Sequence, residues 1–145
     1  MIARSKTLFA YLERNRVKYV VIGGVAAILH GVPRMTGDID ILIEAGLENT
    51  ERMLKTLSDL GYETSELVTP AGLVAVKLLI FENSIKIDVM LNIPGLEFAA
   101  AWTNKKIQYI DDQKFYIISK EDLIASKKAS GRKRDLEDVA ALTQS

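Results

Sequence analysis

Three aspartates in two apolar segments are the residues of this sequence best suited to chemistry. Asp38 and Asp40 lie two positions apart at the start of one apolar run, and Asp88 lies in the middle of another. Side chains two positions apart in a strand point to the same face, so the first two carboxylates lie side by side. Adjacent anions repel each other and are costly to desolvate, and a divalent cation removes both costs. If the two strands are neighbours, the three carboxylates can hold Mg²⁺ or Mn²⁺ ions for in-line transfer at a phosphorus atom.

A glycine pair and two residues that precede the aspartates suit phosphate binding. Gly23 and Gly24 follow a β-branched run and precede a short, alanine-rich apolar segment. A helix N-terminus exposes backbone N–H groups, and glycines let a phosphate approach the chain closely. Arg34 carries a planar guanidinium that binds a phosphate through two parallel hydrogen bonds, and Thr36 lies just before the aspartate pair.

A basic run near the C-terminus offers further phosphate ligands. Five basic residues fall between positions 127 and 134. Within this run Lys127 and Arg132 are the best candidates to hold a phosphate or the acceptor of the reaction. Asp135 and Asp138 follow directly, and they can neutralise part of its charge.

Each of these residue sets also has a purely structural explanation. The first two aspartates can begin a solvated strand, and Asp88 can pair with Lys86 or another surface charge. The glycines can form a plain tight turn, and the basic run can be a solvated helix end. Arg34 and Thr36 can be an ordinary surface arginine and strand threonine. The chemistry is therefore indicated by the sets taken together.

Composition narrows the choice of metal and of partner. The 145 residues include no cysteine and one histidine, which excludes thiolate metal sites, cysteine nucleophiles and multi-histidine metal sites. Nineteen basic residues balance nineteen acidic ones, so a general electrostatic attraction to nucleic acid or to an anionic membrane is absent. No segment has the length of a membrane span or the pattern of a signal peptide, and we expect a cytoplasmic protein.

The periodicity of the chain predicts the elements that must position these residues. The expected fold is a small mixed α/β (α+β) sheet flanked by helices, in one domain over residues 1–145 with a helical portion over about 119–145. Strands and helices are expected where apolar residues follow the respective spacing and end at glycine, proline or capping residues. The expected strands are 17–22, 38–43, 73–81, 85–91, 107–110 and 115–118, and the expected helices are 5–16, 25–30, 49–60 (capped by Asn49 or Thr50), 96–102, 119–128 and 135–142.

The spacing of these motifs resembles a known superfamily. The string from Gly23-Gly24 through Gly31-Val32-Pro33-Arg34-Met35-Thr36-Gly37-Asp38-Ile39-Asp40, with Asp88 downstream, resembles nucleotidyltransferases related to DNA polymerase beta. It is most similar to the small prokaryotic members of the abortive-infection and minimal-nucleotidyltransferase type, and the C-terminal run Gly131-Arg132-Lys133-Arg134-Asp135-Leu136-Glu137-Asp138 extends the resemblance over most of the chain. Many superfamily enzymes have Gly-Ser where this chain has Gly23-Gly24, which leaves only backbone donors at the turn.

The resemblance implies a role for each of these residues. Asp38, Asp40 and Asp88 would bind Mg²⁺ or Mn²⁺, and Asp88 would also help to deprotonate the acceptor hydroxyl. Gly23 and Gly24 would hold the β- and γ-phosphates of a nucleoside triphosphate. The resemblance also implies a nucleotidyltransferase-like sheet.

Two functions of different classes follow from the sequence. The first is a metal-dependent transfer of a nucleoside monophosphate from a nucleoside triphosphate to a hydroxyl of a protein, an RNA or a small molecule, in the setting of a toxin–antitoxin or phage-defence system. The second is an antitoxin-like binding module that neutralises a toxin-like partner by contact. The three carboxylates favour the enzyme, because a pure binder has no need of them. The sequence does not indicate the oligomeric state.

Overall fold

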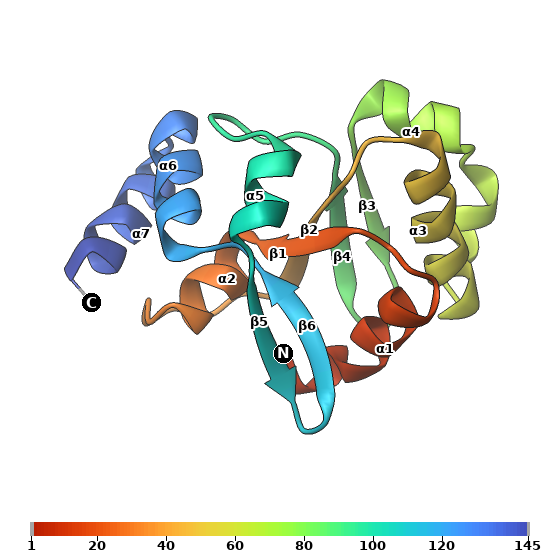
Figure 1. The fold of residues 1–145 in the computed structure, drawn as a ribbon, viewed down its shortest axis with the longest axis horizontal. Helices are drawn as coiled ribbons and strands as arrows, with labels where there is room; N and C mark the ends of the chain where they lie inside the picture. Colours follow the sequence, from red (N-terminus) through yellow and green to blue (C-terminus); the bar gives the residue numbers. More distant parts are fainter. Residues whose placement is uncertain (1, 145) are drawn as a thin grey trace.

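The computed structural model describes residues 2–144, in which helices cover both faces of one sheet (Figure 1). None of the helices within these residues combines the length and the apolar character that a membrane span requires. The strands are β1 (Tyr19–Ile22), β2 (Asp38–Ile43), β3 (Leu78–Glu82), β4 (Lys86–Met90), β5 (Lys106–Ile110) and β6 (Gln113–Ile117). The helices are α1 (Lys6–Arg14), α2 (Gly23–Leu29), α3 (Leu47–Asp59), α4 (Pro70–Val76), α5 (Phe98–Asn104), α6 (Lys120–Ser130) and α7 (Lys133–Gln144), with short 3-10 segments η1 (Ile2–Ser5) and η2 (Glu63–Leu67).

The six strands form a mixed sheet in the order β3-β4-β2-β1-β6-β5. Strand β2 runs antiparallel to β1 and parallel to β4, and the chain between β2 and β4 passes through α3, α4 and β3. Two antiparallel hairpins, β3–β4 and β5–β6, form the two edges. The predicted fold class, a small mixed sheet flanked by helices, is confirmed.

Alternation along the strands divides the side chains between two cores. In β2, Ile39, Ile41 and Ile43 pack into the larger core together with α1 and α3. The other positions of β2 point to the opposite face, where Leu42 packs in a smaller core with α2, α5 and α6. Asp38 and Asp40 lie on this second face, which we call the site face of the sheet.

One predicted strand is wrong in its first half. We expected a strand over 73–81, whereas residues 70–76 form α4 and only β3 is extended. The Thr69 hydroxyl accepts a hydrogen bond from the Gly72 N–H, and Pro70 begins the helix, which are two strong helix-start signals. The apolar run that follows is compatible with either structure, so these capping residues decide its conformation.

The predicted cap of α3 is also wrong. The helix begins at Leu47 after Gly46, and no side chain caps it. Asn49 is instead buried within the first turn, where its side chain accepts a hydrogen bond from the Lys18 N–H at 2.8 Å. The Asn49 side-chain amide also donates to the carbonyl oxygens of Lys18 and Glu44, each at 3.0 Å. One amide therefore fastens α3 to the start of β1 and the end of β2.

We predict that Asn49→Ala lowers the free energy of unfolding by about 2–3 kcal/mol, because it removes three hydrogen bonds to backbone groups that are partly buried. Urea unfolding followed by circular dichroism measures the change. Asn83→Ala is the matched control, because Asn83 makes one exposed hydrogen bond, to the Gly61 carbonyl oxygen. A loss in Asn49→Ala no larger than in this control would contradict the role of Asn49.

Candidate active site

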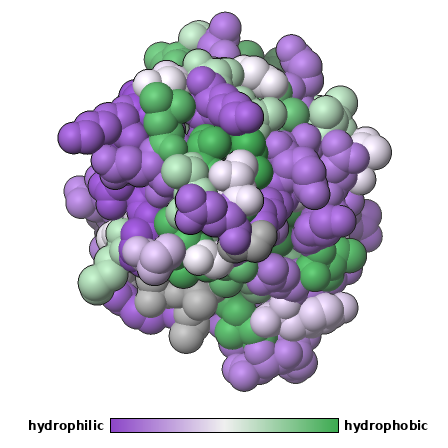
Figure 2. Space-filling model, turned by 90° about the vertical axis from the view of Figure 1, so that its left-hand side faces the viewer, coloured by the Kyte–Doolittle hydropathy of each residue, from purple (hydrophilic) through white to green (hydrophobic). Residues whose placement is uncertain are grey.

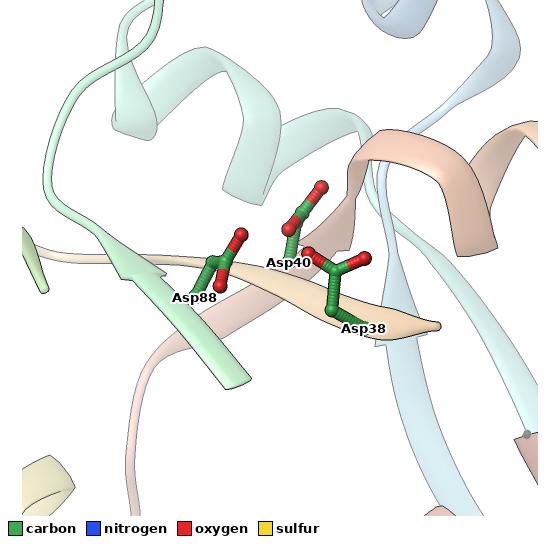
Figure 3. Close-up of side chains that lie close together, drawn as sticks. All are labelled: Asp38, Asp40 and Asp88. Carbon is green, nitrogen blue, oxygen red and sulfur yellow. The ribbon is translucent and has the colours of Figure 1, made fainter. Parts of the chain in front are cut away.

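The pairing of β2 with β4 brings the three predicted aspartates together. Asp40 lies directly opposite Asp88 in this parallel pair, and Asp38 precedes Asp40 by two positions on the same face. One carboxylate oxygen from each residue can be chosen so that all three lie within 4.8 Å of one another. Figure 3 shows the three side chains rising from the same side of the two strands.

The burial of these carboxylates leaves oxygen atoms that nothing in the chain satisfies. Among the described residues, Asp40 Oδ1 and Asp88 Oδ1 are buried and have no hydrogen-bond partner. An ionised carboxylate can only accept, so neither can satisfy the other. Oxygen atoms of this kind are the ligands that Mg²⁺ and Mn²⁺ prefer. The donor set therefore fits a hard divalent cation.

The pKa values of the aspartates also indicate that the site favours a bound positive charge. Burial, followed by the neighbouring Asp88 and Asp38, raises the pKa of Asp40 to about 7. Burial also raises the pKa of Asp88, and the charge of Asp38 adds to this effect. Lys127 acts in the opposite direction on Asp40. The protein thus holds carboxylates where ionisation is unfavourable without a cation.

Gly23 is required by the approach of Asp40. Ile22, the last residue of β1, lies opposite Asp40, so α2 begins directly beside that carboxylate. Gly23 has a φ of +67°, and a Cβ atom there would lie 2.0 Å from Asp40 Oδ2. A side chain is therefore excluded by both the backbone conformation and the space. The phosphate-binding role of this glycine stays a prediction.

Gly24 makes room for the loop that leads into β2. A Cβ atom at Gly24 would lie 3.1 Å from Thr36 Oγ1 and 3.4 Å from a terminal nitrogen of Arg34. Thr36 in turn donates a hydrogen bond to Asp38 Oδ1 at 3.1 Å. We predicted phosphate binding by Thr36, and the structure places its hydroxyl on a carboxylate. The contact orients Asp38 within the triad.

The predicted cations are held by two aspartates of α7. Lys127 is buried, and its ammonium group lies 2.8 Å from Asp138 Oδ2 and 3.4 Å from Asp135 Oδ1. Arg34 reaches the same Asp138 oxygen at 2.5 Å. Arg132 Nε donates to Asp135 Oδ2 at 2.8 Å, although the Arg132 side chain is 79% exposed. Two buried carboxylates therefore fix the positions of three cations.

The pKa of Asp135 reflects this network. Burial of the Asp135 carboxyl opposes its ionisation, but hydrogen bonds from Ser130 and Arg132 together with the nearby charge of Lys127 outweigh burial and lower the pKa. Asp135 is thus an anion whose charge the cations already balance. Asp40 and Asp88 differ, because each has a buried oxygen that no donor among the described residues reaches.

A cleft of about 430 Å³ joins the aspartates to these cations. All the predicted site residues except Thr36 line it. Arg134, Asn92 and Ser126 also line it, and they are not among the predicted site residues. Arg134 stands in the basic run and could have been chosen with Arg132, whereas nothing in the sequence marks the other two. Figure 2 shows the side of the molecule where Figure 1 places α6 and α7, and hydrophilic side chains cover most of it.

We predict that Asp40→Asn stabilises the protein at neutral pH in the presence of EDTA. The folded chain binds a proton at Asp40 more tightly than the unfolded chain does, so the free energy of unfolding falls as pH rises from about 4 to about 7. The asparagine removes this loss, which amounts to at most about 4 kcal/mol. Urea unfolding at several pH values between 4 and 8 measures the difference between the two proteins.

Asp112→Asn is the control for this experiment, because the Asp112 side chain is 93% exposed. The gain of Asp40→Asn over the wild type should be small near pH 4 and should grow with pH, whereas the control follows the wild type. A gain that does not vary with pH would show that Asp40 does not titrate as described.

Similar folds occur in solved structures that share little sequence with this chain. The TM1012 protein of Thermotoga maritima is 18% identical, with 94% of this chain and 86% of that chain covered and a TM-score of 0.58. An antigenic nucleotidyltransferase-like protein of Paracoccidioides brasiliensis is 14% identical, with coverage of 96% and 73% and a TM-score of 0.59. The lincosamide antibiotic adenylyltransferase LnuA, solved with lincomycin bound, is 20% identical, with coverage of 91% and 89% and a TM-score of 0.57. At these identities the likeness shows the fold.

Family membership comes from the sequence itself. No curated protein matches the chain. A family model described as "nucleotidyltransferase of unknown function" (DUF6036) matches residues 3–143, which is nearly the whole chain. The resemblance to small nucleotidyltransferases is thereby confirmed, and the chain belongs to this nucleotidyltransferase family.

Proposed function

We propose that this protein transfers a nucleoside monophosphate from a nucleoside triphosphate to a hydroxyl group, in a reaction that depends on Mg²⁺ or Mn²⁺. One observation carries the proposal: three converging carboxylates, two of them with unsatisfied buried oxygens, share a cleft with a fixed group of cations. Membership of a nucleotidyltransferase family supports the class of reaction. The expected toxin–antitoxin setting rests on the resemblance alone.

The reaction breaks a phosphoanhydride bond of the triphosphate and forms a phosphoester bond to the acceptor. The acceptor oxygen attacks the α-phosphorus, and the bond from that phosphorus to the oxygen bridging toward the β-phosphate breaks. Pyrophosphate leaves with the bonding electron pair, and the acceptor hydroxyl loses its proton. The cation held by Asp38, Asp40 and Asp88 would neutralise phosphate charge and make the hydroxyl more acidic.

The residues of the cleft divide this work between them. Gly23 and Gly24 begin α2, where the first backbone N–H groups have no partner within the helix and can bind the β- and γ-phosphates. Arg34, Lys127 and Arg132 supply positive charge on the side of the cleft formed by α6 and α7. Asp88 has a raised pKa, which suits a carboxylate that takes the acceptor proton.

Arg34 and Lys127 need little rearrangement to bind a triphosphate. Asp138 holds Arg34 and Lys127 in the cleft before any substrate arrives. Preorganised charge stabilises a phosphoryl group more effectively than charge on a mobile side chain. The aspartates of α7 therefore act as positioning residues in this proposal.

We predict that Asp88→Asn separates transfer from binding. The other two carboxylates, the glycines and the cations remain, so calorimetric titration with Mg²⁺ and a non-hydrolysable triphosphate should still detect binding. Transfer should fall by about 100-fold, the usual contribution of a positioned general base. Transfer is measured with labelled triphosphates, Mg²⁺ and a cell lysate as the source of acceptor.

Asp122→Asn provides a carboxylate control on α6 that does not line the cleft. It should transfer at the wild-type rate. An Asp88→Asn protein that also transfers at this rate would remove the proposed base. A wild-type protein that transfers nothing to any acceptor would instead favour the antitoxin-like module that acts by contact.

A further inference from the structure

Apolar side chains adjoin the aspartates on the side away from the cations. In the antiparallel pair β3–β4, Ile80 lies directly opposite Asp88 and Leu78 lies directly opposite Met90. Residues opposite each other in a ladder point to the same face, with Cβ atoms about 5 Å apart. Leu78 and Ile80 therefore share the site face with Asp88, and we call Leu78, Ile80 and Met90 the apolar strip.

The two members of this strip on β3 are open to solvent, although they lie beside a cleft lined by polar groups. Ile80 is 54% exposed and Leu78 is 47% exposed, whereas Phe81, which points to the other face of β3, is buried in the larger core. The helices that pack on the site face contact β1 and β2. Edge strands of soluble proteins usually carry charged side chains on open positions, so two apolar ones beside a polar cleft need an explanation.

The arrangement of the cleft gives that explanation. The cations that suit a triphosphate lie on α6, α7 and the loop before β2, and Gly23 and Gly24 lie next to β2 on the side of β1. Asp88 lies on the opposite side of the triad. Its strand, β4, pairs with β3, which is the edge strand of the sheet. Neighbouring strands are about 4.8 Å apart, so a molecule that rests on β3 can reach the carboxylates directly. Met90 lines the cleft and joins it to the strip.

We propose that the apolar strip seats the acceptor, and that the acceptor carries an aliphatic or aromatic group next to its reacting hydroxyl. This inference rests on the proposed transfer reaction and adds the chemical class of its second substrate. The apolar group would cover Leu78 and Ile80, and the hydroxyl would then lie toward Asp88. The bonds made and broken are those of the transfer described above, with the acceptor proton passing to Asp88.

The test follows the isoleucine methyl signals of the full chain by NMR. The two ligands are 2-phenylethanol and ethylene glycol, which share a primary hydroxyl and differ in the apolar group. Ile80→Ser and Ile107→Ser assign the signals and serve as matched variants, because Ile107 is also 54% exposed but lies on β5 at the opposite edge of the sheet. Each titration is run with and without Mg²⁺ and a non-hydrolysable ATP analogue.

The proposal predicts a saturable shift of the Ile80 signal with 2-phenylethanol and none with ethylene glycol. Ile80→Ser should weaken binding of 2-phenylethanol by about fivefold or more, because contact with an apolar side chain is lost. Ile107→Ser should bind it like the wild type. The shift should persist when the ATP analogue is bound, since the acceptor and the triphosphate use different sides of the cleft.

Several results would overturn the proposal. Equal shifts at Ile80 and Ile107 would show unspecific contact, and loss of the shift on adding the ATP analogue would assign the strip to the nucleobase. A dimer in sedimentation experiments that Ile80→Ser dissociates would assign it to a second copy of the chain. Calorimetry with the ATP analogue on the same samples separates the acceptor seat from the transfer reaction. If the analogue binds but 2-phenylethanol does not shift the Ile80 signal, the acceptor seat alone is rejected. If the analogue does not bind, the transfer reaction is rejected, and the acceptor seat with it.

Discussion

The parallel register of β2 and β4 is the constraint on which the site depends. This register places Asp40 opposite Asp88, and the two-residue spacing adds Asp38 on the same face. The apolar neighbours that fill the larger core cannot leave it, so the carboxylates cannot turn away from each other. The fold therefore forces the carboxylates to repel each other and to lose hydration. A bound cation is the simplest means of relieving both effects.

The other elements of the site make room for the three aspartates, orient them or place positive charge near them. Gly23 permits α2 to begin against Asp40, and Thr36 fixes the orientation of Asp38. The C-terminal helices supply positive charge, and the aspartates of α7 hold that charge in place. Replacing such buried ion pairs by apolar residues is often neutral for stability, so their presence beside the cleft is better explained by function than by folding. The apolar strip, which we propose seats the acceptor, adjoins Asp88 on the side of the triad away from Arg34, Lys127 and Arg132.

The sequence was sufficient for some features because they depend on local spacing. Strand alternation placed Asp38 and Asp40 on one face. The helix expected over 119–128 corresponds to α6, at whose start the Ser119 hydroxyl accepts a hydrogen bond from the Asp122 N–H. Other features depend on tertiary contacts. No local pattern shows that Lys127 is buried between Asp135 and Asp138, or that Asn49 fastens three elements instead of capping a helix. The register that sets Ile80 opposite Asp88 depends on where β3 begins, and the strand predicted over 73–81 began too early because residues 70–76 form α4.

The central claim is that Asp38, Asp40 and Asp88 form one site for a divalent cation. Electron paramagnetic resonance tests it most directly, because the signal of free Mn²⁺ falls as the ion binds, and the measurement needs neither nucleotide nor acceptor. We predict that the wild type binds Mn²⁺ in a titration at pH 8 and that Asp38→Asn combined with Asp40→Asn abolishes this binding, while Asp112→Asn leaves it intact. A double variant that binds Mn²⁺ as the wild type does would contradict the account.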